Sequence, residues 1–385
     1  MKAMVGSSIL SNSYEAGAET ARNSTKGLKN PKIGFLFSSA KYNQDEFLNG
    51  IKSVCPSLKV VGCTSSGAVM TPDGIISNPD GFAGMLVFED NDLRVGVAAS
   101  DRGVEPRITG RKLAREAMEN AAKNYAPAAF ALFASPNEEE EYIKGVQDVI
   151  GEVPIFGGSA SDDEFLGEWK VLGNNKSYSD GCAIALFYTN KQIRTIFDSN
   201  YNETTSMGIV TQLEGERKII EIDGMPALKK YAQWNGLNPD ALMGKNLLKA
   251  SISKPIAVKN LNGDITLVRH PRAGGSDYSI IVGAKIINKS SVILLDSDVD
   301  GLIDGCVKNV KRTRDNLHPA GLLLIHSAER KMLIDDRLDE DYVAIKNAVG
   351  DLPFIVAFTS GEYGHANHSG ACVSNLSLSF TAISE

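Results

Sequence analysis

The chain has 385 residues, of which 43% are hydrophobic, and it carries a formal net charge of −7 with a pI near 5.4. A chain of this length can bury a large core and, at roughly 150 residues per domain, suggests two or three domains, of which we expect two. The acidic balance and the lack of a long Lys/Arg run argue against a nucleic-acid partner.

The N-terminal residues turn polar at 6–8, and no apolar run approaches the roughly 18 residues that span a bilayer. We therefore expect no signal peptide, no membrane insertion and a cytoplasmic location. Five scattered cysteines form no Cys-x-x-Cys pair, which predicts reduced thiols.

One pattern occurs three times along the chain: an apolar strand, a short amphipathic helix and a second apolar strand that ends in Gly, Ser and Thr. A helix-periodic segment precedes each copy and a further apolar segment follows it, which indicates a repeated unit. The copies comprise 32–37, 45–54 and 59–67, then 129–133, 138–150 and 153–161, then 321–325, 341–349 and 354–362; the preceding helices are 14–28, 107–123 and 299–316, and the following segments are 81–88, 181–187 and 370–380.

The predicted strands are continuously apolar, which is typical of strands covered by helices on both faces. The sequence therefore predicts an α/β protein with mixed, buried sheets, built from helix-strand-helix-strand-hairpin units. Short polar turns predict that 84–88 pairs with 94–98, and 183–188 with 194–197, as hairpins. The sheets should extend antiparallel at one side.

After residue 200 the pattern changes to a strand at 218–222, a helix at 226–234 and a run of antiparallel strands between 256 and 295. We place the domain boundary near 202–208. This gives an N-terminal domain, 1–205, with two repeats, and a C-terminal domain, 206–385, with the third.

The Gly/Ser/Thr ends of the second strands are candidate ligand-binding segments. Ligands of open α/β sheets bind beyond the carboxyl ends of strands, and small residues let backbone N–H groups and hydroxyls approach a ligand closely. The alternative is that small residues only permit tight turns and helix packing. The candidates are Gly62, Cys63, Thr64, Ser65 and Ser66 in the first copy, Gly157, Gly158, Ser159 and Ser161 in the second, and Thr359 and Ser360 in the third.

Further side chains near these segments have two interpretations each. Asp162, Trp169 and Asn174 would supply a carboxylate, an aromatic wall and an amide to an amino-acid-like ligand, or would serve the loop itself. Arg269 would clamp a ligand carboxylate or form an internal salt bridge. Glu362 would accept a ligand ammonium or cap the next turn. The acidic run 138–141 suits a helix N-terminus and is predicted to be solvated.

A Glu-x-x-His-x-x-His spacing at Glu362, His365 and His368 would suit a metal if the loop curled so that all three side chains converged. The glycines at 361, 364 and 370 argue against a regular helix there. The alternative is an exposed polar loop.

Six segments, taken in order, resemble the FIST family, a sensory module with an N-terminal and a C-terminal half. The resemblance implies a cytoplasmic module that binds small molecules such as amino acids and signals through a separate protein, for instance a histidine kinase or a chemoreceptor. The chain departs from the family pattern at 326–330 and at 363–368. The segments are 35–39, 61–67 and 154–162 in the first half, and 223–231, Arg269 and 358–362 in the second.

The resemblance also makes haem a candidate cofactor, because one FIST subgroup with a similar arrangement of segments senses nitric oxide through haem. His270, His326, His365 and His368 are candidate axial ligands, and His326, His365 and His368 are also the candidate metal ligands. Without a Cys-x-x-Cys-His motif, haem would be of the b type.

The sequence contains neither a Gly-x-Ser-x-Gly elbow nor a P-loop motif. We therefore expect a non-catalytic sensor without a cofactor. A haem-based nitric oxide sensor is the first alternative. An enzyme that uses Cys63 as a nucleophile, or a metal at the 362–368 loop, is the second.

Overall fold

The computed structural model describes residues 1–259, 266–366 and 370–385. Three six-stranded sheets share one plan, and a fourth sheet is inserted before the third repeat. Each of the three combines a parallel pair with antiparallel neighbours, so the predicted α/β class with mixed sheets is confirmed. No helix in the described part of the chain is both long and apolar enough to cross a bilayer.

The first sheet contains the first repeat. Strands β2 and β3 are parallel, and two helices cover the outer face. Asn12 and Asn43 start these helices, because each side chain accepts a hydrogen bond from a backbone N–H of the first turn. In spatial order the strands are β1 (Lys2–Ser8), β6 (Ala83–Glu89), β2 (Ile33–Ser38), β3 (Lys59–Thr64), β10 (Val171–Gly173) and β11 (Lys176–Tyr178), and the helices are α1 (Ser13–Ser24) and α2 (Gln44–Val54).

The second and third sheets repeat this plan. The second contains β25 (Gly370–Ser374), β24 (Glu362–Ala366), β9 (Ile155–Ser159), β8 (Ala129–Ala134), β12 (Gly181–Tyr188) and β7 (Arg94–Asp101), with helices α3 (Pro106–Asn120) and α4 (Glu139–Ile150). The third contains β13 (Ile193–Asp198), β26 (Leu378–Ser384), β22 (Pro319–Ser327), β23 (Phe354–Thr359), β4 (Val69–Thr71) and β5 (Gly74–Ile76), with α7 (Val299–Arg314), α8 (Ala328–Ile334), a 3₁₀ turn (Asp335–Arg337) and α9 (Leu338–Val349).

Each repeat gives its hairpin to the sheet of another repeat. The hairpin β4–β5 follows β3 in the chain but pairs with β23 of the third sheet. In the same way β10–β11 follows β9 and pairs with β3, and β24–β25 follows β23 and pairs with β9. The three units are therefore interlocked in a closed ring, which we call the three-sheet ring.

The two predicted hairpins, 84–88 with 94–98 and 183–188 with 194–197, are wrong. Strand β7 pairs with β12, and β13 pairs with β26. The reason is that β6 already lies between β1 and β2, and β12 between β7 and β8, so neither has a free edge for the strand that follows it. Each short polar turn instead carries the chain into the next sheet.

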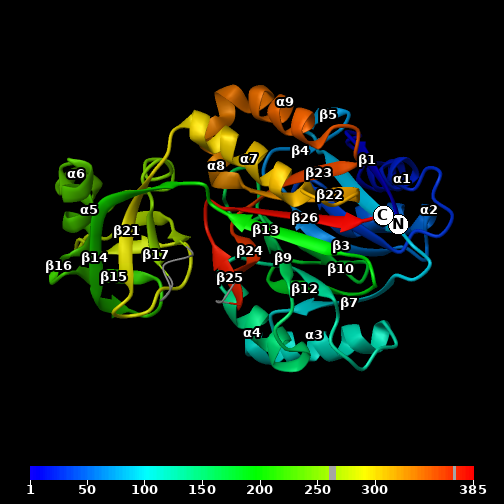
Figure 1. Ribbon diagram of the computed structural model, residues 1–385, viewed down its shortest axis with the longest axis horizontal. Helices are drawn as coiled ribbons and strands as arrows, with labels where there is room; N and C mark the ends of the chain where they lie inside the picture. Colours follow the sequence, from blue (N-terminus) through cyan, green and yellow to red (C-terminus); the bar gives the residue numbers. More distant parts are fainter. Residues whose placement is uncertain (260–265, 367–369) are drawn as a thin grey trace.

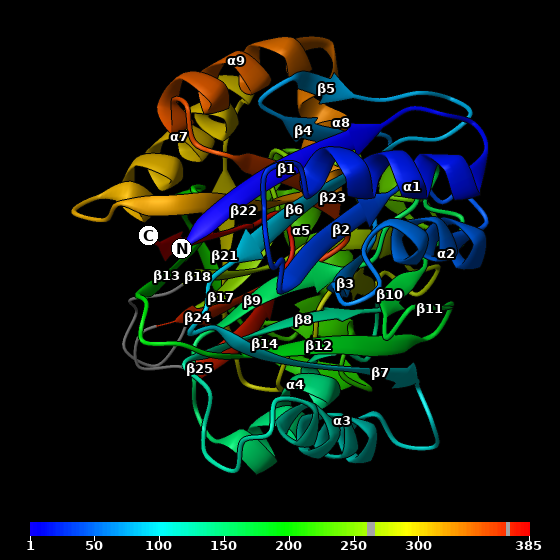
Figure 2. The ribbon, with the colours of Figure 1, turned by 90° about the vertical axis from the view of Figure 1, so that its right-hand side faces the viewer.

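The inner faces of the three sheets meet in one apolar core. Phe35, Phe156 and Phe187 come from two of the sheets and lie with ring centroids 5.7 to 5.9 Å apart. The helices cover the outer faces: α1 and α2, α3 and α4, and α7 and α9 occupy three sides of the ring (Figure 2). Strands buried on both faces explain the continuously apolar sequence.

The fourth sheet, which we call the inserted sheet, stands beside the ring (Figure 1). The chain enters it at Asn202 and returns to the ring with α7, and the predicted boundary near 205 falls within its first strand. Its strands are β18 (Thr266–Arg269), β17 (Ile256–Lys259), β21 (Ser291–Asp296), β14 (Asn202–Glu214), β15 (Lys218–Ile222), β20 (Ile280–Val282) and β19 (Pro271–Gly274), with β16 (Met225–Pro226) beside β15 and helices α5 (Ala227–Asn235) and α6 (Pro239–Leu242).

Candidate functional site

The carboxyl ends of β3, β9 and β23 converge at the centre of the ring. The Ser161 N–H donates to the Thr64 carbonyl at 3.1 Å, and the Ser360 N–H donates to the Ser159 carbonyl at 3.0 Å. The Ser66 N–H donates to the carbonyl of Phe358, next to Thr359, at 3.0 Å. The fold therefore brings together three Gly/Ser/Thr segments that lie about 100 to 300 residues apart in the sequence.

Most hydroxyls at this centre are already hydrogen-bonded within the protein. Ser159 pairs with the Tyr363 hydroxyl at 2.6 Å, and Ser161 with Ser360 at 2.9 Å. Ser65 Oγ donates to the Ala68 carbonyl at 2.7 Å. Because these groups are buried and bonded, they hold the three strand ends together.

The glycines and the cysteine of these segments serve packing. A Cβ on Gly62 would lie 1.8 Å from the Leu36 carbonyl oxygen, and one on Gly157 would lie 1.9 Å from the Leu132 carbonyl oxygen. A Cβ on Gly158 would lie 2.6 Å from Thr359 Oγ1. Cys63 is completely buried in the core, and burial raises its thiol pKa, which opposes formation of a nucleophilic thiolate.

Asp162, Trp169 and Asn174 do not form one wall with the strand ends. The Asp162 carboxylate accepts four backbone N–H groups of residues 164–168, at 2.8 to 3.1 Å, and so organises its own loop. Trp169 packs against the central core. Asn174 lies in the turn between β10 and β11 and lines a separate surface pocket of about 260 Å³ with Lys59 and Asn120.

Arg269 forms neither a salt bridge among the described residues nor a clamp open to ligand. Its guanidinium donates to the backbone carbonyls of Lys285, Val268 and Val373, the last at 3.1 Å on β25 of the ring. Burial lowers its pKa to about 10. Arg269 thus joins the inserted sheet to the ring.

Glu362 is also committed to internal hydrogen bonds. Its carboxylate accepts from the Ser377 N–H at 2.9 Å, and from the Gly361 N–H and the Thr359 hydroxyl at 3.2 Å each. Burial, and then the nearby Glu329, raise the Glu362 pKa well above its ordinary value. None of these donors belongs to the turn that directly follows Glu362, so the carboxylate does not cap that turn; it joins the end of β23 to the segment before β26.

The described part of the predicted metal loop is an extended strand, β24 (Glu362–Ala366). Glu362 and His365 lie three residues apart on strand β24, so their side chains point to opposite faces of the sheet. His368 lies outside the described residues. The expectation that Glu362 and His365 converge on one metal is therefore wrong.

His270 and His326 are completely buried, and burial lowers the pKa of each to about 3, so both are neutral. They lie on different sheets, His270 beside β19 and His326 near the end of β22. His326 is close to Cys306 and Asp341, two residues that the sequence reasoning did not connect with it.

The residues that sequence reasoning missed form a charged cluster between the strand ends and the inserted sheet. We call it the junction site and define it as Glu139, Arg217, Arg272, Glu329 and Ser360. Arg272, on β19, donates to Glu329 Oε1 at 3.2 Å and to the Ser360 carbonyl at 3.3 Å through Nη2. Its Nε is buried and has no hydrogen-bond acceptor among residues 1–259, 266–366 and 370–385.

The expectation that 138–141 is solvated is wrong for Glu139. It starts α4 and is 1% exposed, and its Oε2 accepts no hydrogen bond from the described residues. Nη2 of Arg217 lies 3.6 Å from this oxygen. Burial, and then Glu140, raise the Glu139 pKa to about 7 despite the opposing effect of Arg217 and Arg272.

Two features connect this cluster to the strand ends. A Cβ on Gly361 would lie 3.0 Å from Ser159 Oγ and 3.9 Å from Glu139 Oε1, so this glycine lies against both the second strand end and the carboxylate. Glu139 and Glu329 occupy the first turns of α4 and α8, the helices that follow the first strands of the second and third repeats. The alignment of the repeats matches 138–150 with 341–349, which belongs to α9, and so does not pair these two carboxylates.

Comparison with known proteins identifies the family. The FIST N domain matches residues 32–225 and the FIST C domain matches residues 227–365. The chain therefore belongs to the FIST family, whose domains are sensory modules that bind small ligands in signalling. No curated protein matches the chain.

Solved structures resemble the chain only distantly. Cyanuric acid hydrolase from A. caulinodans is 9% identical over 100% of this chain and 99% of its own, with a TM-score of 0.36. T. maritima PurL in complex with ADP is 9% identical over 99% of this chain and 71% of its own, with a TM-score of 0.24.

Proposed function

We propose that this FIST protein is a sensor that binds an amino-acid-like ligand at the junction site and passes its bound state to a signalling partner. The observation that carries the proposal is a pair of opposite charges with unused hydrogen-bonding atoms, Glu139 Oε2 and Arg272 Nε, both buried. A buried polar atom without a partner is destabilising, so a ligand that satisfies both atoms gains binding free energy.

The chemistry of the two side chains selects a zwitterion. The Glu139 carboxylate would accept a hydrogen bond from the α-ammonium of the ligand, and the Arg272 guanidinium would donate to its α-carboxylate. The Arg272 side chain is 25% exposed, which gives the site an opening to solvent. Convergent binding groups without an activated nucleophile favour binding over turnover.

The location of the site supplies a route for a signal. Glu139 belongs to the three-sheet ring, whereas Arg272 belongs to the inserted sheet. A ligand that bridges them would strengthen the contact between these two parts and so change what a partner protein meets. The resemblance suggests a histidine kinase or a chemoreceptor as that partner, in the cytoplasm, where cysteine thiols stay reduced.

A thermal-shift screen of amino acids followed by titration calorimetry tests the proposal. We expect one amino acid to raise the unfolding midpoint, because a ligand at about 100 times its dissociation constant adds roughly 2.7 kcal/mol to the stability. Arg272→Ala should weaken its binding by about 10- to 150-fold, as expected for the loss of about 1.5 to 3 kcal/mol from a charged hydrogen bond.

Arg107→Ala is the matched control, because Arg107 on α3 pairs at the surface with Asp148 on α4 at 2.8 Å, as a cation outside the junction site. It should bind the ligand as tightly as the unchanged protein. Equal affinity in the Arg272→Ala and Arg107→Ala variants would contradict the proposed site.

A further inference from the structure

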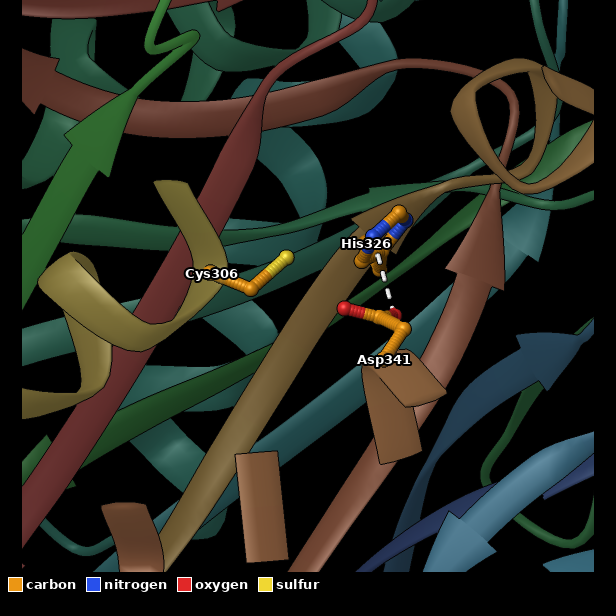
Figure 3. A group of neighbouring side chains, drawn as sticks. All are labelled: Cys306, His326 and Asp341. Carbon is orange, nitrogen blue, oxygen red and sulfur yellow. Dashed lines mark ion pairs between the residues drawn. The ribbon is translucent and has the colours of Figure 1, made fainter. Parts of the chain in front are cut away.

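A second cluster of unused buried polar atoms lies in the third repeat. Cys306 on α7, His326 on β22 and Asp341 on α9 point toward one another (Figure 3). One potential ligand atom from each lies within 4.8 Å of the others, and His326 Nε2 is 3.8 Å from Asp341 Oδ2. All three residues are completely buried.

The nitrogen and oxygen atoms of this cluster lack the partners that burial demands. His326 Nε2 and both Asp341 oxygens form no hydrogen bond with any residue that the structure describes. An unsatisfied buried polar group costs about 1 to 3 kcal/mol, and here three such atoms face one point. A bound cation that accepts electron pairs from nitrogen, oxygen and sulfur would satisfy the atoms of all three side chains together.

We propose that Cys306, His326 and Asp341 bind a zinc ion. A thiolate, an imidazole and a carboxylate are the three side-chain types that hold Zn²⁺, and three protein ligands with one open position form a recognised zinc geometry. Bond lengths of about 2.0 Å to nitrogen and oxygen and about 2.3 Å to sulfur put tetrahedral ligand atoms about 3.3 to 3.6 Å apart. Small side-chain rotations would bring the present separations to these values.

The surroundings orient the imidazole for this role. His326 Nδ1 lies 3.0 Å from the Ser327 carbonyl oxygen, which favours a proton on Nδ1 and leaves the Nε2 electron pair directed at the cluster. A thiolate and a carboxylate would together balance the two positive charges of the ion. The buried Arg330 next to the cluster donates to the carbonyls of Ser199, Leu302 and Leu376 through its two terminal nitrogens, whereas its Nε has no hydrogen-bond partner among the described residues.

The ion would tie α7 and α9 to the end of β22, one residue before Ser327. The Ser327 hydroxyl donates to Glu329 Oε2 at 3.0 Å, so the zinc site would adjoin the junction site. The zinc proposal does not depend on the junction site, and its test uses the metal alone.

The test measures the zinc content of the purified full-length protein and the spectrum of its Co²⁺ form. We expect one zinc per chain, together with thiolate-to-cobalt charge-transfer absorption and the intense visible bands of tetrahedral cobalt. Cys306→Ser and His326→Gln should lower the metal affinity by about tenfold or more, because each removes a direct ligand. Chelation of the unchanged protein should lower its unfolding midpoint, and zinc should restore it.

Cys182→Ser is the matched control, since Cys182 is equally buried but lies outside the cluster. It should keep the zinc and the cobalt spectrum. Folded protein that takes up neither ion, or a charge-transfer band that survives Cys306→Ser, would overturn the proposal. If Cys306→Ser does not fold, the spectrum of the unchanged protein and of His326→Gln decides the question.

Discussion

At the scale of single residues, Glu139 gives the proposed ligand site a pH dependence. Its pKa is raised to about 7 in the free protein, and the groups that face it are Glu140, Arg217, Arg269, Arg272 and Tyr363. A ligand ammonium requires the ionised carboxylate. Affinity should therefore rise about tenfold between about pH 6 and about pH 8, as the ionised fraction rises by about that factor. Calorimetric titrations across this range measure the effect.

Glu139→Gln should bind the ligand weakly and with a flat pH profile. An unchanged rise in affinity in this variant would assign the titration to another group.

The stability of the free protein should fall as pH rises, because a carboxyl whose pKa is raised on folding binds its proton more tightly in the folded state. As pH rises from about 5 to about 8, the free energy of unfolding should fall more in the unchanged protein than in Glu139→Gln.

The same residues show how far sequence reasoning reaches into the site. It identified the strand ends that converge, including Ser360, because a local run of Gly, Ser and Thr after an apolar strand is visible in the sequence. It missed Arg272 because the partner of this side chain, Glu329, is 57 residues away and lies on helix α8 of the ring. It misjudged Glu139 because three further acidic residues beside it resemble a solvated helix start.

At the scale of elements, two of the helix pairs that cover the ring, α3 with α4 and α1 with α2, approach closely through glycine. A Cβ on Gly145 of α4 would lie 2.1 Å from the Arg107 carbonyl oxygen of α3, and a Cβ on Gly110 would lie 2.4 Å from the Tyr142 carbonyl oxygen. On the first sheet, Gly17 and Gly50 play the same part between α1 and α2. Contact of backbone with backbone leaves no flexible side chain to move aside.

Gly145→Ala should therefore destabilise the protein by about 1 to 3 kcal/mol, because α3 and α4 must separate to admit the methyl group. Urea unfolding followed by circular dichroism measures this change. Lys144→Ala, at an exposed neighbouring position of the same helix, should change stability by no more than about 0.5 kcal/mol. Stability unchanged by Gly145→Ala would show that the close approach is not required.

The elements themselves were predicted well and their partners poorly. Continuous apolar runs and helical periodicity are local signals, so the repeated strands and helices of the ring follow from the sequence. Pairing between β7 and β12, or between β4 and β23, joins segments that are distant in the chain, and no local pattern specifies it. The interlocked ring therefore emerges only in the structure.

At the scale of the whole molecule, a ligand at the junction site would bind the ring and the inserted sheet to each other. Hydrogen exchange with and without the ligand should show greater protection of β19, β20 and the first turns of α4 and α8. Helices α1 and α2, on another side of the ring, should exchange at unchanged rates (Figure 2). If the ligand bound tightly but did not increase protection in the inserted sheet, the proposed signalling route through the contact between the ring and the inserted sheet would be wrong.

A crystal structure of the protein with the amino acid found in the screen tests the central claim most directly. The account predicts a ligand between the strand ends and the inserted sheet, with its ammonium on Glu139 and its carboxylate on Arg272. A ligand bound in another part of the molecule, such as the pocket lined by Lys59, Asn120 and Asn174, would contradict it.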